Sequence, residues 1–320
     1  MNKILPFLNL IRFKNLAIIV LTQYFVKYSL INYFVNEFIL SDLNFFLLVL
    51  ATILITAAGY IINDLYDLDI DKINKNNTVI IDTHISSKQA IWWYAILNIT
   101  GLILGLYLAF IVDKLILSII FIYSAYSLFS YSRKFKKSFL VGNIQIALLT
   151  ALCIVNIPLY DIWSNGVISD DGEVMTFKII LYYAGFSALI TFIREIIKDI
   201  EDYSGDLAYN AKTLVITLGI KKAKQLVMLI IAITIFFISY VQYFQYSIMS
   251  TEFEYEISIW GANNTAVIYI IFIQLLFVYL SLKVYKAKEK KDFYFISQLC
   301  KIIMILGVFS IPIFTYLHLN

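Results

Sequence analysis

Long apolar stretches separated by short polar segments follow one another along the whole chain. Windows of about 19 residues place them at 16–36, 43–62, 91–111, 115–131, 139–160, 178–197, 225–247, 264–283 and 297–317. Each stretch can cross a hydrocarbon core of ~30 Å as a helix, the form in which such a run pairs its own backbone groups. The pattern therefore predicts an all-α, polytopic membrane protein of about nine transmembrane helices.

Composition supports this interpretation and narrows the chemistry. The 320 residues are 61% hydrophobic and 15% charged, with a mean hydropathy of +0.82, which is far from the composition of soluble domains. Because no polar linker divides the chain, we expect residues 1–320 to form a single membrane domain. His84 and His318 are the only histidines, which argues against zinc sites and histidine-based triads, and Cys153 and Cys300 are expected to be packing residues.

Positive charge is distributed unevenly between the two sides of the predicted bundle. If the N-terminus is cytoplasmic, 21 of the 25 Lys and Arg residues fall in the N-terminal segment or in the loops after the second, fourth, sixth and eighth helices. We therefore expect a multi-pass protein of the cell (inner) membrane with its N-terminus inside. The acidic residues of the opposite side are expected to lie in solvated loops without chemistry: Asp161, Asp170, Asp171, Glu173, Glu252, Glu254 and Glu256.

An acidic segment follows the second predicted helix. Residues 63–72 read NDLYDLDIDK, in which Asp64, Asp67 and Asp71 recur at i, i+3 and i+7. A continuing helix would present these three carboxylates on one face, whereas Asp69 would point elsewhere. Like charges on one stripe repel one another, and cations between them would relieve that repulsion.

A second acidic segment, at residues 194–213, follows the sixth predicted helix. Asp199, Asp202 and Asp206 repeat the spacing of the first segment, and both segments are expected on the cytoplasmic side. Carboxylates that run into transmembrane helices are costly and are a functional hypothesis by default. Two matching stripes are more informative than one, since a single stripe could belong to a solvated loop.

Several interpretations of the paired stripes are open. An EF-hand is excluded, because a loop counted from Asp67 has no glycine at its sixth position and has Thr78 where a bidentate Glu is required. A cation transporter, or a structural membrane protein with two unrelated acidic loops, is an alternative, although the acids lie at helix ends rather than in mid-span. The interpretation that uses both stripes is Mg²⁺ bridging a diphosphate, since Mg²⁺ prefers a few carboxylates together with phosphate oxygens.

At these residues the sequence resembles the UbiA superfamily of intramembrane prenyltransferases. Asn63, Asp64, Asp67 and Asp71 match the family's first motif, NDxxDxxxD, and the second segment matches its second motif, DxxDxxxD. Further similarity at 12–15, 131–143 and 205–220 extends the likeness over nearly the whole chain. The resemblance implies nine helices around a central cavity, with both aspartate motifs at its cytoplasmic side.

Membership of this family would imply Mg²⁺-dependent transfer of a polyprenyl group with release of diphosphate. The catalytic and metal-binding candidates are Asp64, Asp67, Asp71, Asp199, Asp202 and Asp206, with Asn63 as a further metal ligand. The candidate contacts to the diphosphate substrate are Asn63, Lys72, Lys136, Arg194, Lys198, Lys212, Tyr131 and Asn15. Aromatic side chains would shield the allylic cation, and the candidates are Tyr60, Tyr66, Tyr131, Phe192 and Tyr203.

The acceptor is the least constrained part of this prediction. Residues 194–202 look most like the branch that builds digeranylgeranylglyceryl phosphate, which implies an acceptor of the geranylgeranylglyceryl phosphate type; an aromatic acceptor of quinone synthesis, hydroxybenzoate or naphthoate, is the alternative. After residues 74–75 the family usually has a proline and an Arg-Pro pair, which residues 76–79 of this chain lack. The expected partners are a prenyl diphosphate, a lipid-soluble or aromatic acceptor and membrane lipid, with no nucleic acid and no obligate protein partner.

Overall fold

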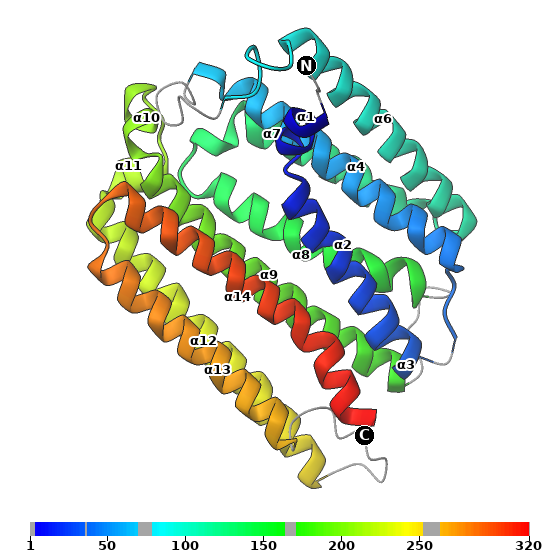
Figure 1. The fold of residues 1–320 in the computed structure, drawn as a ribbon. Coiled ribbons are helices and arrows are strands. Elements are labelled where there is room, and N and C mark those ends of the chain that lie inside the picture. Colours follow the sequence, from blue (N-terminus) through cyan, green and yellow to red (C-terminus); the bar gives the residue numbers. More distant parts are fainter. Residues whose placement is uncertain (1–3, 36, 70–78, 164–170, 252–262, 320) are drawn as a thin grey trace.

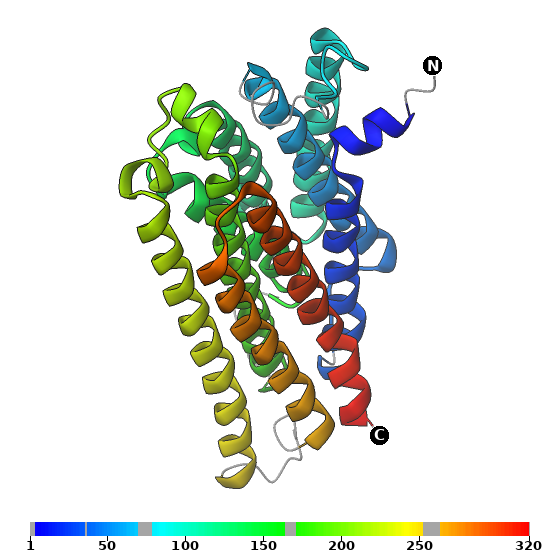
Figure 2. The ribbon, with the colours of Figure 1, turned by 60° about the vertical axis from the view of Figure 1, so that its left-hand side comes forward.

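A computed structural model of the chain describes residues 4–35, 37–69, 79–163, 171–251 and 263–319. Within these ranges nine helical spans are long and apolar enough to cross a membrane, and no strand is formed, which confirms the predicted fold class. The spans lie side by side in one bundle, with α1 at one end and the end of α14 at the other (Figures 1 and 2).

The helices have the following bounds. The first span consists of α2 (Phe13–Phe25), the π-helix η1 (Val26–Ile31) and α3 (Asn32–Phe34). The others are α4 (Asp42–Tyr66), α6 (Ser87–Ile111), α7 (Ser118–Arg133), α8 (Val141–Asp161), α9 (Asp171–Glu201), α12 (Ile220–Thr251), α13 (Asn264–Lys286) and α14 (Lys290–Leu319). Short helices are α1 (Ile4–Leu10), η2 (Leu115–Leu117), η3 (Phe135–Lys137), α10 (Tyr203–Ala208) and α11 (Leu214–Leu218).

Several helices extend beyond the predicted apolar stretches. α4 continues to Tyr66 instead of ending near residue 62, and α9 continues to Glu201 instead of ending near residue 197. Hydropathy locates only the turns that match the hydrocarbon core, whereas a helix keeps its backbone hydrogen bonds through further polar turns. These extra turns carry the candidate aspartates out of the apolar part of each span.

Local sequence signals account for several helix starts. The hydroxyl of Ser41 accepts a hydrogen bond from the Asn44 amide at the start of α4. Ser86 and Gln89 form a reciprocal capping box at the start of α6, and the side chain of Asn263 caps α13. Each cap provides a partner for amide groups that the first helical turn leaves unpaired.

Small residues allow close packing between neighbouring helices. At Gly105 of α6 an added Cβ would lie 2.4 Å from the ring of Phe121 on α7, and at Gly101 it would lie 2.7 Å from Ile55 on α4. Such contacts are typical of helices packed in lipid. The first and last membrane spans also meet, because the Thr315 hydroxyl of α14 donates to the Ser29 carbonyl of η1 at 2.6 Å.

Candidate active site

The first acidic motif lies at a helix break. α4 ends at Tyr66, and Asp67 adopts φ −95° and ψ −1° while its amide still donates to the Asn63 carbonyl at 3.0 Å. The helix is therefore interrupted at Asp67, and residues 68 and 69 are again helical. Asp71 and Lys72 lie outside the described residues.

The second acidic motif repeats this break. α9 ends at Glu201, Asp202 adopts φ −94° and ψ 9°, and the chain turns into α10. The Asp202 amide donates to the Lys198 carbonyl at 2.8 Å, and the Asp206 amide donates to the Asp202 carbonyl at 3.1 Å. The middle aspartate of both motifs thus has nearly the same backbone conformation, in a sparsely populated region where active-site residues often lie.

The two motifs meet at one end of the bundle. Figures 1 and 2 show the end of α4 and the short helix α10 at the same end. The Lys136 ammonium forms a salt bridge with Asp67 of the first motif and interacts electrostatically with Asp199 and Asp206 of the second. One cation therefore reaches both motifs.

Negative charge is crowded around Asp206. Burial, together with the neighbouring carboxylates of Asp202 and Asp67, raises the pKa of Asp206 to about 6, although Lys136 and Lys137 oppose the shift. The carboxylates of both motifs thus repel one another across a short distance, and an added cation would relieve that repulsion.

Arg12, which precedes α2, is the second cation at the first motif. Its Nη2 donates to Oδ1 of Asp64 at 2.9 Å, and its guanidinium lies 4.7 Å from the centre of the Tyr60 ring. Arg12 has φ 52° and ψ 51°, a left-handed conformation that is uncommon for a residue with a side chain. Asn15 lies beside this pair, and its Nδ2 donates to the Tyr60 hydroxyl at 3.3 Å.

The loop between α7 and α8 supports the second motif. Asn143 Nδ2 donates to Oδ2 of Asp199 at 2.8 Å, and the Lys212 amide donates to the Lys137 carbonyl at 2.9 Å. At Gly142 an added Cβ would lie 2.7 Å from the Phe135 carbonyl oxygen, so a side chain there would push the loop away. The side chain of Lys212 is exposed, and only its backbone joins this arrangement in the described contacts.

Glu195 is a charged residue of this region to which the sequence analysis gave no role. Arg194 Nη1 and Lys198 Nζ each lie 3.2 Å from its Oε1, and Arg12 interacts with it electrostatically. Glu195 precedes Asp199 by four residues, so the same helical periodicity that selected the aspartates could have identified it.

The five aromatic candidates divide among three environments. Tyr60 contacts Arg12, and Tyr131 interacts electrostatically with the acidic residues of both motifs. Phe192 and Tyr203 instead pack against a hydrophobic cluster built by α9 and α11–α14, and the exposed Tyr66 packs against Phe129. Tyr60 and Tyr131 are thus the two that lie among the charged groups.

The donor set fits a hard divalent cation. Among the described residues no three acidic side chains are already gathered as metal ligands, and Arg12 and Lys136 pair with Asp64 and Asp67. Asn63, however, is buried, donates its Nδ2 to Asp67 at 2.8 Å, and leaves its Oδ1 without a hydrogen-bond partner in the described structure. A buried amide oxygen beside carboxylates provides the oxygen ligands that Mg²⁺ prefers.

The opposite end of the bundle contains a different arrangement. Asp161, expected in a solvated loop, is instead fully buried and pairs with Lys27 at 2.5 Å, and its carboxylate also accepts from the Leu40 amide at 2.9 Å. That expectation is wrong because Asp161 ends α8 inside the bundle, where Lys27 on η1 compensates its charge. Lys27 also lies 3.9 Å from the centre of the Phe38 ring.

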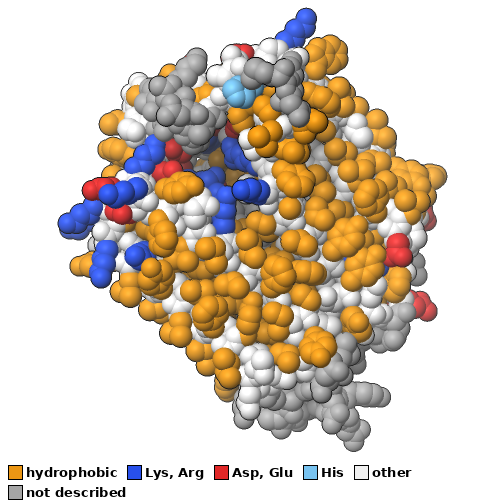
Figure 3. All heavy atoms as spheres, in the orientation of Figure 1, with side chains coloured by type: hydrophobic (Ala, Val, Ile, Leu, Met, Phe, Trp, Pro, Cys, Tyr) orange, Lys and Arg blue, Asp and Glu red, His pale blue; other side chains and the backbone are white. Residues whose placement is uncertain are grey.

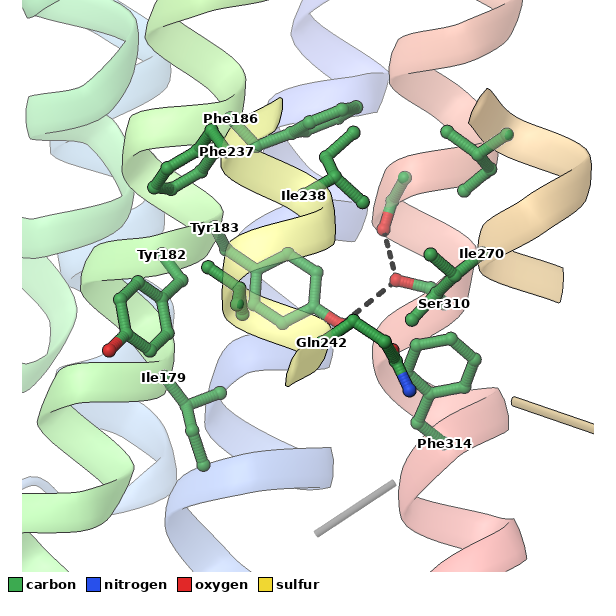
Figure 4. Close-up of a pocket in the computed structure, with 13 residues that line it drawn as sticks. Ile179, Tyr182, Tyr183, Phe186, Phe237, Ile238, Gln242, Ile270, Ser310 and Phe314 are labelled. Carbon is green, nitrogen blue, oxygen red and sulfur yellow. Dashed lines mark hydrogen bonds between the residues drawn. The ribbon is translucent and has the colours of Figure 1, made fainter. Parts of the chain in front are cut away.

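A separate apolar pocket opens between α9, α12, α13 and α14 (Figure 4). It holds about 630 Å³ of space not filled by atoms, including open space at its mouth. Tyr183 and Ser310 point toward one another at 2.9 Å, and Phe186, Phe237 and other apolar side chains form its wall. None of the lining residues is one of the candidate site residues.

These features define a helical membrane protein in which two acidic helix breaks at one end of the bundle share basic partners. The chain belongs to the UbiA prenyltransferase family, which its sequence matches over residues 28–299. The paired motifs, the nine spans and this match together confirm the family that the sequence resembles.

Relatives in this family share a name. The chain is 38% identical over 185 residues to the digeranylgeranylglyceryl phosphate synthase of Saccharolobus solfataricus, a match that covers 57% of this chain and 60% of that protein. It is 31% identical over 264 residues to the protein of the same name from Methanosphaera stadtmanae, covering 82% of this chain and 84% of that protein.

Solved structures show the same fold. A structure of a digeranylgeranylglyceryl phosphate synthase aligns with a TM-score of 0.64 and 25% identity, covering 98% of this chain and 99% of that one. A UbiA homologue from Archaeoglobus fulgidus, bound to GPP and Mg²⁺, aligns with a TM-score of 0.56 and 14% identity, covering 96% of this chain and 99% of that one. The second likeness is one of fold alone.

Proposed function

We propose that this protein transfers a polyprenyl group from a prenyl diphosphate to a lipid alcohol of the geranylgeranylglyceryl phosphate type, with Mg²⁺ and with release of diphosphate. The observation that carries the proposal is the pair of matching helix breaks at Asp67 and Asp202, with Lys136 paired with Asp67 of the first motif and acting electrostatically on Asp206 of the second. The family supports prenyl transfer, and the names of the relatives support the type of acceptor. The Lys and Arg asymmetry supports a location in the cell (inner) membrane with the N-terminus and the active site cytoplasmic.

Metal binding falls to the acidic motifs in this proposal. The ligands would be Asn63, Asp64, Asp67, Asp71, Asp199, Asp202 and Asp206. Mg²⁺ bound there would neutralise the diphosphate and stabilise the charge that it gains on leaving.

Basic side chains of the chain itself would hold the phosphate oxygens. Lys136 and Arg12 pair with carboxylates in the described structure, and the same carboxylates are proposed metal ligands. With metal bound to those carboxylates, the Lys136 ammonium and the Arg12 guanidinium would become available to donate charge-assisted hydrogen bonds to the phosphate oxygens of the prenyl diphosphate. Asn143 keeps Asp199 oriented through its 2.8 Å hydrogen bond.

The bond changes follow from the substrates. The bond between the allylic carbon and the diphosphate oxygen breaks with both electrons remaining on diphosphate. The acceptor hydroxyl oxygen then forms the new bond to that carbon, and its proton passes to the released diphosphate. Tyr60 and Tyr131 are placed to present aromatic faces near the charged groups, where cation–π contact would shield the developing allylic cation from water.

The direct experiment supplies the purified protein with radiolabelled geranylgeranyl diphosphate and Mg²⁺, together with either geranylgeranylglyceryl phosphate or 4-hydroxybenzoate. We expect a lipid-soluble double-chain product from the first acceptor, with EDTA abolishing its formation. Product from 4-hydroxybenzoate alone would replace the lipid acceptor by the aromatic one. No diphosphate release with either acceptor, combined with ion movement in liposomes, would favour the cation transporter.

A further inference from the structure

An excess of positive charge lies beside the first acidic motif. Glu195 on α9 pairs with Arg194 and Lys198, and Lys301 on α14 interacts electrostatically with Glu195 and with Arg194. Lys301 also interacts with Arg12, which pairs with Asp64. We name Arg12, Arg194, Lys198 and Lys301 the cationic cluster.

Lys301 is an unusual residue for its position. It lies within the membrane-spanning helix α14, where an ionisable side chain is costly and marks a functional site by default. The charged groups that act most strongly on it include three cations, Arg194, Arg12 and Lys14, and one acid, Glu195. Repulsion among these cations would favour an anion between them.

Basic side chains outnumber acidic ones in the cationic cluster, as far as the structure describes its surroundings. Four basic side chains face two carboxylates, those of Asp64 and Glu195, so the basic groups exceed the acidic ones by two. A phosphate monoester carries about −1.5 to −2 charges at neutral pH, which matches this excess. A benzoate-type acceptor would bring a single negative charge and leave one cation uncompensated.

A hydrogen-bond donor in the cluster also lacks a partner. The Nε atom of Arg194 is buried and has no acceptor among the described residues, although the Nη1 of the same guanidinium binds Glu195. A guanidinium offers parallel donors that suit phosphate oxygens. Leaving a buried donor unsatisfied is unfavourable, so a bound phosphate oxygen would stabilise this side chain.

The surface around these residues suits a lipid head group. Figure 3 shows Lys and Arg side chains, with Asp and Glu side chains among them, gathered around a hollow in the upper part of the molecule, next to a wide hydrophobic surface. A phosphate-headed lipid could place its charge in the hollow while its chain remains on apolar surface.

We infer that the cationic cluster binds the phosphate of the lipid acceptor, at a place distinct from the diphosphate held by the acidic motifs. The inference rests on the proposed function and deepens it, because it explains how a phosphate-headed alcohol would be selected. Arg12 contacts Asp64 as well as the cluster, and it would hold the acceptor beside the donor. Arg194 and Lys198, first considered as diphosphate contacts, are assigned to the acceptor phosphate.

Binding of the acceptor without the donor tests the inference. The full chain in nanodiscs, in EDTA, is titrated with geranylgeranylglyceryl phosphate and with the same lipid lacking its phosphate. We expect the wild type to prefer the phosphate form by about 10-fold or more, and Lys301→Gln to lose most of that preference while binding the dephosphorylated lipid as the wild type does. Lys301→Arg should restore it.

Two further variants keep the test decisive. Arg194→Gln should give the same loss if Lys301→Gln fails to fold, whereas Lys291→Gln, an exposed substitution on the same helix, should change nothing. In steady-state assays we expect the acceptor KM of Lys301→Gln to rise about 10-fold, with the KM for prenyl diphosphate within about twofold of wild type.

Either of two results would overturn the inference: equal weakening of both lipids in Lys301→Gln and Arg194→Gln, or weaker binding of prenyl diphosphate with unchanged acceptor binding. Failure of the proposed function would look different. In that case wild-type protein would release no diphosphate with Mg²⁺ and either acceptor, whatever the donor-free titration showed.

Discussion

The two ends of the bundle use charge in opposite ways. At one end Lys27 and Asp161 are both fully buried, pair one to one at 2.5 Å, and receive further contacts from the Leu40 amide and the Phe38 ring. At the other end the pair of Arg12 and Asp64 keeps side-chain exposures of 30% and 21%, and one lysine, Lys136, reaches carboxylates of both motifs. At the first end the two opposite charges are buried and compensate each other, whereas at the second end the charged groups are partly exposed and one lysine serves both motifs.

This difference separates a structural charge from a functional one. In a buried ion pair the two charges compensate each other, and the pair stabilises the native state only while both partners are present. The charged end keeps an unpartnered oxygen on Asn63 and an unpartnered donor on Arg194 beside its carboxylates and basic groups, whereas at the other end the unpartnered Tyr160 hydroxyl is not part of the ion pair, within the described structure. Unmade hydrogen bonds at such a place are a sign of a ligand that completes them.

The largest expected effect comes from removing an aspartate of the charged end. Asp64→Ala and Asp202→Ala should each lower prenyl transfer by about 10³-fold or more, because charge stabilisation on the leaving diphosphate is lost. Product formation by purified protein measures this. Asp69→Asn, an exposed acid in the same segment, serves as the control and should remain near wild-type activity; retained activity in both alanine variants would contradict the mechanism.

The buried ion pair should respond in the opposite manner. Lys27→Met leaves the Asp161 carboxylate buried without its partner and should cost about 3–5 kcal/mol of stability, while activity per folded molecule stays near that of the wild type. Thermal unfolding in detergent, with activity normalised to folded protein, separates the two effects. The double variant Lys27→Met/Asp161→Asn should recover much of the loss, since an amide oxygen can still accept from the Leu40 amide. An unchanged Tm in Lys27→Met would contradict the structural role that the comparison assigns to the buried ion pair.

A smaller effect is expected at the shared lysine. Lys136→Met should weaken binding of prenyl diphosphate by about 10–100-fold, because charge-assisted hydrogen bonds to phosphate are lost. Lys134→Met is a matched control, since Lys134 is exposed two positions earlier and its ammonium lies over the Phe135 ring. Equal effects of the two substitutions would mean that Lys136 acts through general surface charge.

The smallest expected effect concerns Asn63. Asn63→Leu removes the free Oδ1 and the hydrogen bond to Asp67, and it should raise the Mg²⁺ concentration needed for half-maximal activity by about 10-fold. A magnesium titration at saturating substrate measures the shift. An unaltered magnesium requirement would remove Asn63 from the proposed ligand set.

The sequence predicted the transmembrane spans well, because a helix that crosses the hydrocarbon core must be apolar over most of its length and hydropathy measures this property directly. It also identified both motifs by their spacing. It did not predict the helix breaks at Asp67 and Asp202. A break at a single residue leaves the spacing of the acidic residues along the sequence unchanged, so the spacing does not reveal it. It also placed Asp161 in solvent, since the partner of this carboxylate, Lys27, is distant in the chain. Pairings of that kind depend on tertiary packing, which a local pattern does not contain.

The most direct test of the account is whether the two acidic motifs hold one diphosphate together. Mg²⁺-dependent binding of a non-reactive geranylgeranyl diphosphate analogue would be measured for wild type, Asp64→Asn, Asp202→Asn and the double variant. The account predicts that each single variant loses most of the binding, about 10²-fold, and that the double variant loses little more, because one shared ligand couples the two positions. Independent, additive losses, or full binding in either single variant, would contradict it.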